Sequence, residues 1–148
     1  MNEKEIIELL TDGADEEVLK QIESIVKSGN AELISSVFRK YEDAINEYED
    51  EEKAEEECAN GDMSFGLSLY KGIARLILIL GKVLKVNNYE TIEEAYDLDD
   101  SAFSYIYDYK MFVEMFLDED EKELEDANNM YEELKEVFDD ANYDDYED

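Results

Sequence analysis

Apolar residues recur three and four positions apart along most of this chain, which is the spacing of one face of an α-helix. The first clear stripe lies between Asp15, placed to cap a helix, and Gly29, placed to end one. Its members are Val18, Leu19, Ile22, Ile25 and Val26. This segment is therefore predicted to be an amphipathic helix.

A second stripe follows Asn30, a residue type that favours the N-cap of a helix. The stripe stops after Tyr48, where acidic residues replace apolar ones. It consists of Leu33, Ile34, Val37, Phe38, Tyr41, Ile45 and Tyr48. A long helix with one buried face is predicted here, and its core-facing side is expected to end at Tyr48.

Residues 65–86 are apolar on nearly all sides, which predicts a helix buried in the centre of the protein. Gly61 is expected to close the region before it. The strongest apolar run, residues 76–80, is far too short to cross a bilayer. The N-terminus has no cationic leader. No contact with a membrane is therefore expected.

The remaining apolar stripes predict helices toward the C-terminus. Thr91 and Glu94 form a capping-box pattern. One stripe follows the polar stretch DLDDS, and the last one leads into the acidic end of the chain. Their members are Phe103, Ile106, Val113, Phe116 and Leu117, and then Leu124, Ala127, Met130, Tyr131, Leu134, Val137 and Phe138.

These patterns predict an all-α fold, because no strand signal competes with them. We expect a compact bundle of about five to six helices around the central apolar helix at about residues 65–86. Residues 1–138 are expected to form a single helical domain with an acidic outer shell. Residues 139–148 are expected to be a frayed acidic tail.

Composition narrows the possible functions. The chain has 44 acidic and 13 basic residues, a net charge of −31, and no histidine. Histidine-based triads and imidazole metal sites are excluded, and no pair of carboxylates stands out as acid and base. Cys58 is the only cysteine, so no intrachain disulfide forms. We therefore expect neither an enzyme, a metal site nor a cofactor.

The charge is unevenly distributed. Residues 1–62 sum to −14 and residues 90–148 to −21, whereas residues 63–89 sum to +4 and contain no acid. The central helix thus resembles an internal post whose basic side chains extend to surrounding carboxylates. Such an acidic exterior repels nucleic acid and anionic membranes and attracts basic partners.

Four acidic clusters and interleaved tyrosines are the candidate contacts for such a partner. Glutamates four apart in residues 47–57 would repel one another on a continuous helix, and the pattern leaves open whether this segment is helix or loop. Tyr107 and Tyr143 offer faces for arginine, while Tyr105 and Tyr109 have the spacing of a core edge. The candidate partner-binding residues are Glu47, Glu49, Asp50, Glu51, Glu52, Glu55, Glu56, Asp97, Asp99, Asp100, Tyr107, Asp118, Glu119, Asp120, Glu121, Asp139, Asp140, Tyr143, Asp144 and Asp145.

The net negative charge of the chain is comparable to that of a short DNA duplex. Duplex DNA carries one negative charge per ~1.7 Å, so −31 corresponds to roughly 50 Å of duplex. In its small size, acidity and acid-tyrosine tail DDANYDDYED, the chain resembles phage-encoded acidic DNA mimics, namely antirestriction and DNA-mimicking anti-CRISPR proteins. The resemblance implies an inhibitor, often dimeric, that occupies the DNA-binding site of a defence enzyme in the host bacterial cytoplasm. Its partner would be a basic DNA- or RNA-binding protein.

Two other functions compete with this hypothesis. An immunity protein or antitoxin that neutralises a basic nuclease would use the same electrostatic complementarity. A low-affinity calcium binder is suggested by Asp97, Asp99, Ser101 and Asp108, which match positions 1, 3, 5 and 12 of an EF-hand loop. Ala102 stands where that loop needs glycine, and Asp108 replaces its bidentate glutamate, which disfavours calcium binding.

Overall fold

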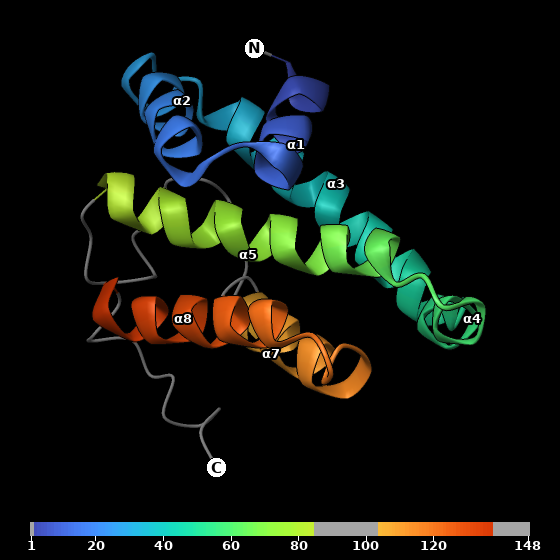
Figure 1. Cartoon of the computed structure of the whole chain (residues 1–148). Coiled ribbons are helices and arrows are strands. Elements are labelled where there is room, and N and C mark those ends of the chain that lie inside the picture. The colour runs from blue at the N-terminus through green and yellow to red at the C-terminus, as the bar shows by residue number, and fades with distance from the viewer. Residues whose placement is uncertain (1, 85–103, 138–148) are drawn as a thin grey trace.

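The computed structural model describes residues 2–84 and 104–137, and these residues form seven helices and no strand (Figure 1). The helices are α1 (Glu3–Asp12), α2 (Asp15–Lys27), α3 (Ala31–Asp50), α4 (Lys53–Asn60), α5 (Ser64–Leu84), α7 (Ser104–Phe116) and α8 (Glu121–Val137). The all-helical prediction is confirmed. The pattern of the sequence did not single out α1 and α4 as separate helices. The predicted tail lies outside the described residues, as does the Thr91–Glu94 capping box.

Helix α5 is the centre of the bundle, as predicted. It packs against each of the other six described helices. Figure 1 shows α1 and α2 on one side of α5 and α7 and α8 on the other. Every residue from 72 to 81 is buried. The core also includes the predicted stripe of α3, from Ile34 to Tyr48, together with Ile22 of α2 and Tyr109 of α7.

The burial of α5 explains its apolar composition. Residues 64–83 are long and apolar enough to cross a membrane when judged by length and composition alone, which the short 76–80 run did not suggest. However, 72% of the apolar window is buried against the rest of the fold. This degree of burial is typical of the core helix of a globular domain.

The predictions of helix-ending glycines agree with the structure better than the predictions of N-cap residues. Gly29 and Gly61 have φ of 77° and 76° after α2 and α4, a conformation that glycine adopts without a steric penalty. Asn30 occupies the N-cap of α3, but its side chain makes no capping hydrogen bond. The prediction for Asp15 is wrong, because Ala14 is the N-cap of α2 and Asp15 is the first helical residue.

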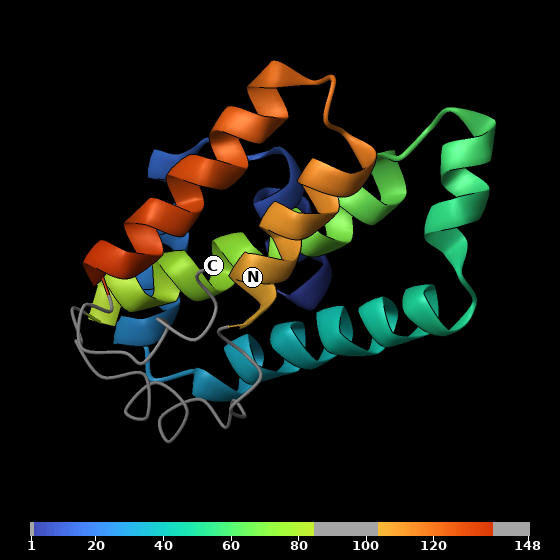
Figure 2. The ribbon, with the colours of Figure 1, turned by 90° about the horizontal axis from the view of Figure 1, so that it is seen from below.

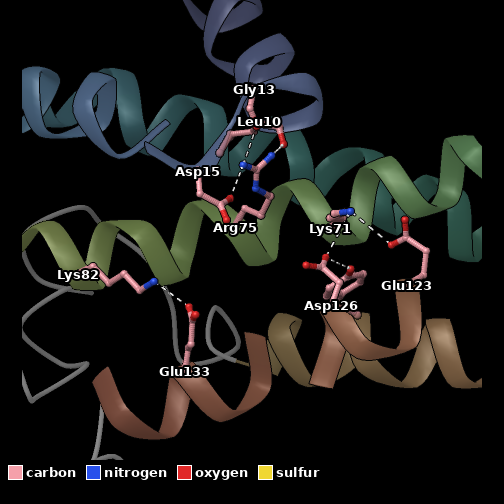
Figure 3. A network of polar contacts seen from close by, with 10 residues as sticks. Leu10, Gly13, Asp15, Lys71, Arg75, Lys82, Glu123, Asp126 and Glu133 are labelled. Carbon is pink, nitrogen blue, oxygen red and sulfur yellow. Dashed lines mark hydrogen bonds and ion pairs between the residues drawn. The ribbon is translucent and has the colours of Figure 1, made fainter. Parts of the chain in front are cut away.

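Asp15 instead belongs to a polar network around Arg75 of α5 (Figure 3). The Arg75 side chain is only 9% exposed. Its guanidinium donates to the carbonyl oxygens of Leu10 and Gly13, the latter at 2.9 Å, and to the Asp15 carboxylate at 2.8 Å. Arg75 thereby satisfies carbonyls at the end of α1 and fixes the α1–α2 turn on the central helix.

Two lysines of α5 extend toward α8, on the side of α5 opposite to the α1–α2 turn. Lys71 pairs with Glu123 and Asp126, both at 3.3 Å, and Lys82 pairs with Glu133 at 2.7 Å (Figure 3). These acids lie on α8. The basic side chains of the central helix α5 thus extend to surrounding carboxylates, as predicted.

Two glycines of α5 allow aromatic side chains to approach its backbone closely. A Cβ atom built on Gly72 would lie 2.6 Å from Cζ and Cε1 of Tyr41. One built on Gly66 would lie 2.6 Å from Cζ of Tyr48 and 2.9 Å from Cζ of Phe112. These separations are shorter than van der Waals contact, so the tyrosines of α3 pack where α5 has no side chain.

Replacing Gly72 with alanine tests this packing. In an exposed helix the change would stabilise by about 1 kcal/mol. Here the new methyl group overlaps a buried ring, so Gly72→Ala is expected to lower the free energy of unfolding by about 1–3 kcal/mol in urea titrations. Ser68→Ala in the same helix is the control, expected to stay within about 0.5 kcal/mol. A Gly72→Ala protein as stable as the wild type would contradict the close contact.

Candidate functional site

The first acidic cluster, defined as residues 47–56, forms a helix–turn–helix. Helix α3 ends at Asp50, and α4 begins at Lys53. Between them Glu52 has a φ of 52°, a left-handed conformation that is uncommon for a residue other than glycine. The sequence left open whether this segment is helix or loop. In the structure it is the end of one helix and the start of another, joined by a sharp turn. The turn means that residues 51 and 55, and 52 and 56, do not stack along one continuous helix.

The acidic side chains of this cluster face solvent. The exposed members are Glu47, Glu49, Asp50, Glu51, Glu52, Glu55 and Glu56. Helix α4 has no buried residue. Lys53 lies 3.5 Å from Glu51 and 3.9 Å from Glu56, and it is the described cation that pairs with this cluster. The cluster therefore keeps most of its negative charge.

Glu57 holds α4 in place, a role that sequence reasoning missed. Its Oε1 atom accepts hydrogen bonds from the Tyr48 hydroxyl and from the backbone N–H of Gly66, both at 3.1 Å. Burial, together with the Glu57 carboxylate, raises the pKa of Tyr48, so this hydroxyl remains a donor. One carboxylate thus connects the acidic helix to the end of α3 and the first turn of α5. Half-buried Ala54 lies one helical turn earlier on the same side, but no feature of the sequence distinguished Glu57 from Glu55 and Glu56.

The second acidic cluster, residues 118–121, comprises the turn between α7 and α8 together with the first residue of α8. Asp118, Glu119, Asp120 and Glu121 are all exposed. Asp120 also accepts a hydrogen bond from the Glu123 N–H at 3.1 Å, which caps α8. No cation within the described residues pairs with these four carboxylates. Figures 1 and 2 place this turn and α4 toward the same end of the bundle, where α5 begins.

The remaining candidate residues divide into two groups. The tyrosines of this set within the described residues lie in or against the core: Tyr105 and Tyr109 are buried as predicted, and half-buried Tyr107 packs against Tyr131 with ring centroids 6.0 Å apart. The other candidates lie outside the described residues. They are Asp97, Asp99, Asp100, Asp139, Asp140, Tyr143, Asp144 and Asp145.

Asp108 is a half-buried acid behind the first cluster. Burial first, and the negative charge of Glu49 second, raise its pKa to about 6. Glu49 in turn accepts a hydrogen bond from the Tyr70 hydroxyl at 2.9 Å, and burial and this carboxylate raise the pKa of Tyr70. Asp108 lies within α7, and the described residues contain no cluster of acids arranged to hold a metal ion. Asp97, Asp99 and Ser101 of the suggested calcium loop lie outside them.

A cavity of about 560 Å³ lies between the α1–α2 turn, α5 and α8. Lys71, Arg75 and Lys82 line it, and each is paired with a carboxylate of the protein. Leu19, Leu78, Ile79 and Met130 supply apolar walls. We call this cavity the α5 groove. Three basic side chains line it, whereas Lys53 is the described cation that pairs with the acidic clusters.

No family model, curated protein or solved structure matches this chain. Inferences about its function therefore depend on its own residues.

Removing the Glu57 carboxylate tests how α4 is held. Glu57→Ala leaves the buried Tyr48 hydroxyl without its acceptor, so the free energy of unfolding is expected to fall by about 1–3 kcal/mol in urea titrations. Hydrogen exchange of α4 amides should accelerate in the same variant. Glu56→Ala, one position away and exposed, should change stability by less than about 0.5 kcal/mol. Equal effects of the two substitutions would rule out the Glu57 contact.

The raised pKa of Asp108 predicts a pH-dependent stability difference. An unfolded chain releases this proton near the ordinary pKa of 3.8, whereas the folded protein keeps it up to about pH 6. Asp108 therefore destabilises the fold most above pH 6, and this cost disappears as the pH falls toward 3.8. Asp108→Asn should stabilise the protein at pH 8 by up to about 3 kcal/mol and by much less at pH 4.

Urea titrations of the variant and the wild type at both pH values measure this difference, and comparison of the two proteins cancels the titration of other acids. Exposed Asp50→Asn is the control, with a small difference at both pH values. A stabilisation by Asp108→Asn that does not change with pH would show that Asp108 has an ordinary pKa.

Proposed function

We propose that this protein is a DNA-mimic inhibitor that occupies the basic nucleic-acid-binding cleft of a bacterial defence protein, such as a CRISPR effector or a restriction enzyme. The observation that carries the proposal is the separation of charges on the described surface. Basic side chains pair mainly with acids outside the two exposed clusters, for example Lys27 with Glu23 and Lys82 with Glu133. The clusters at the α4 end keep their negative charge for a partner.

Preorganisation supports this proposal. A flexible acidic segment would lose conformational freedom when it bound, whereas residues 47–56 are already fixed by the turn at Glu52 and by the bonds of Glu57. Lysines and arginines that neutralise the phosphates of DNA release its condensed counterions, and the same side chains would release the cations attracted by dense, rigid carboxylates. Binding also relieves the repulsion among the acids of the inhibitor.

The same electrostatic argument predicts the kind of partner and the location where the protein acts. The partner would be a basic DNA- or RNA-binding protein in the cytoplasm of the host bacterium. A net charge of −31 opposes direct binding to nucleic acid or to an anionic membrane. The acidic phage inhibitors that this chain resembles are often dimeric, which makes a homodimer an alternative to a monomer.

Capture from bacterial lysate at low and moderate salt, with DNA as competitor, identifies the target. One DNA-binding defence protein that DNA displaces would support the proposal. A single small nuclease toxin would support the immunity-protein alternative instead. A mixture of basic proteins that moderate salt removes would mean that the charge attracts them without specificity, and would contradict the proposal.

Charge reversal in the first cluster tests whether it forms the inhibitory surface. One reversal, such as Glu55→Lys, should weaken inhibition of the captured protein less than about tenfold, because contacts between exposed charges are individually weak. Changing Asp50, Glu51, Glu55 and Glu56 to lysine together should weaken it by about 100-fold or more. Dose–response curves measure the loss, and circular dichroism should show unchanged helix content.

A matched control separates local charge from net charge. Reversing Glu8, Asp12, Glu17 and Glu32, which are exposed on α1, α2 and the start of α3, changes the net charge by the same amount. Helices α1 and α2 and the start of α3 lie away from α4 (Figure 1). The control should retain inhibition within about tenfold at moderate salt. Full activity of the first fourfold variant would eliminate this surface as the inhibitory site.

A further inference from the structure

Large apolar side chains are exposed beside the two acidic clusters. On the described surface, Phe65 is 56% exposed, Met115 66% and Met111 38%. We call these three residues the apolar rim. The other exposed large apolar residue of the described surface is Leu19, at 37%, which lies on α2 and lines the α5 groove.

The rim borders one buried aromatic group. The Phe65 ring packs against Tyr48, with centroids 6.0 Å apart, and Tyr48 packs against Phe112 at 6.4 Å. Phe112 stacks on Tyr70 at 4.8 Å. Met111 precedes Phe112 in α7, and Met115 follows it one helical turn later. Phe65 thus contacts this aromatic group directly, and Met111 and Met115 are helical neighbours of its member Phe112.

Acidic side chains lie on both sides of this rim. Phe65 is in the first turn of α5, next to Gly66, whose N–H donates to Glu57 of the acidic helix α4. Met115 lies in the last turn of α7, three residues before the cluster that begins at Asp118. The start of α5, α4 and the α7–α8 turn lie toward the same end of the bundle (Figures 1 and 2), so exposed apolar and acidic residues occur at that end together.

We propose that the rim is a contact site for a basic protein segment that places an apolar side chain between lysines or arginines. This inference rests on the proposed function and adds the chemistry of the partner segment. The neighbouring carboxylates disfavour phosphate, an anionic membrane and a second copy of this chain, because each would bring like charges within a Debye length of about 8 Å. They favour cations, and the exposed methionines and phenylalanine add affinity that salt does not screen.

Two helical peptides of equal length and charge provide the test, one built of leucine and lysine and the other with glutamine in place of leucine. Fluorescence anisotropy at moderate salt should show the leucine peptide binding about tenfold more tightly or better. Phe65→Ser, Met111→Ser and Met115→Ser combined should remove this preference and leave the glutamine peptide bound as before. Because Phe65 also packs on Tyr48, the Met111→Ser, Met115→Ser pair alone provides a second, milder variant.

Leu19→Ser is the matched control, since it removes an exposed apolar residue from the other part of the molecule. It should leave both affinities unchanged. Equal binding of the two peptides, or a loss of preference in Leu19→Ser as large as that in the rim variants, would overturn the inference. A dimer at moderate salt that the rim variants dissociate in sedimentation experiments would also overturn it, because the rim would then bind a second copy.

The two proposals fail in different assays. If the rim preference is present but charge reversal at Asp50, Glu51, Glu55 and Glu56 leaves inhibition intact, the proposed function fails and the rim remains a contact site. If charge reversal abolishes inhibition but the two peptides bind equally, the inhibitor acts through charge alone and the inference about the rim fails.

Discussion

Burial of the apolar helix α5 is the interaction on which the rest of the structure depends. The chain carries a net charge of −31, and the repulsion among its acids opposes any compact state. Every residue from 72 to 81 is removed from solvent, at roughly 25 cal/mol for each Å² of apolar surface buried. The other helices, α4 excepted, can carry many acids because each contributes one apolar stripe to this common core. The absence of acids from residues 63–84 is a direct consequence of that arrangement.

The few basic residues are placed where they stabilise the contacts of α5. Buried Arg75 joins the α1–α2 turn to the central helix, while Lys71 and Lys82 join α8 to it. Charges that are paired in this partly enclosed groove contribute more than they would on the open surface. The same placement leaves the α4 end with little neutralising charge. The electrostatic asymmetry of the surface therefore follows from how the core is held together.

The helical stripes made the fold predictable, because period and burial are local properties of the sequence. The stripe of α3 and the terminating roles of Gly29 and Gly61 were read directly from the sequence. Long-range polar partners could not be read in this way. Glu57 has the same chemistry as Glu55 and Glu56, and only the packing of Tyr48 and Gly66 against α4 distinguishes it. Likewise Asp15 had the local features of a cap, yet a buried arginine sixty positions later determines its role.

Net charge and local geometry make different contributions to recognition. Charge attracts every basic macromolecule and is screened within about 8 Å at physiological salt, so it supports association without selecting one partner. Selection requires groups fixed in short-range contact. At the α4 end, the turn at Glu52 and the bonds of Glu57 fix carboxylates near the start of α5, where Phe65 is exposed. This combination of fixed charge and apolar surface is a physical reason to assign recognition to one end of the bundle, and it distinguishes that end from a uniformly acidic exterior.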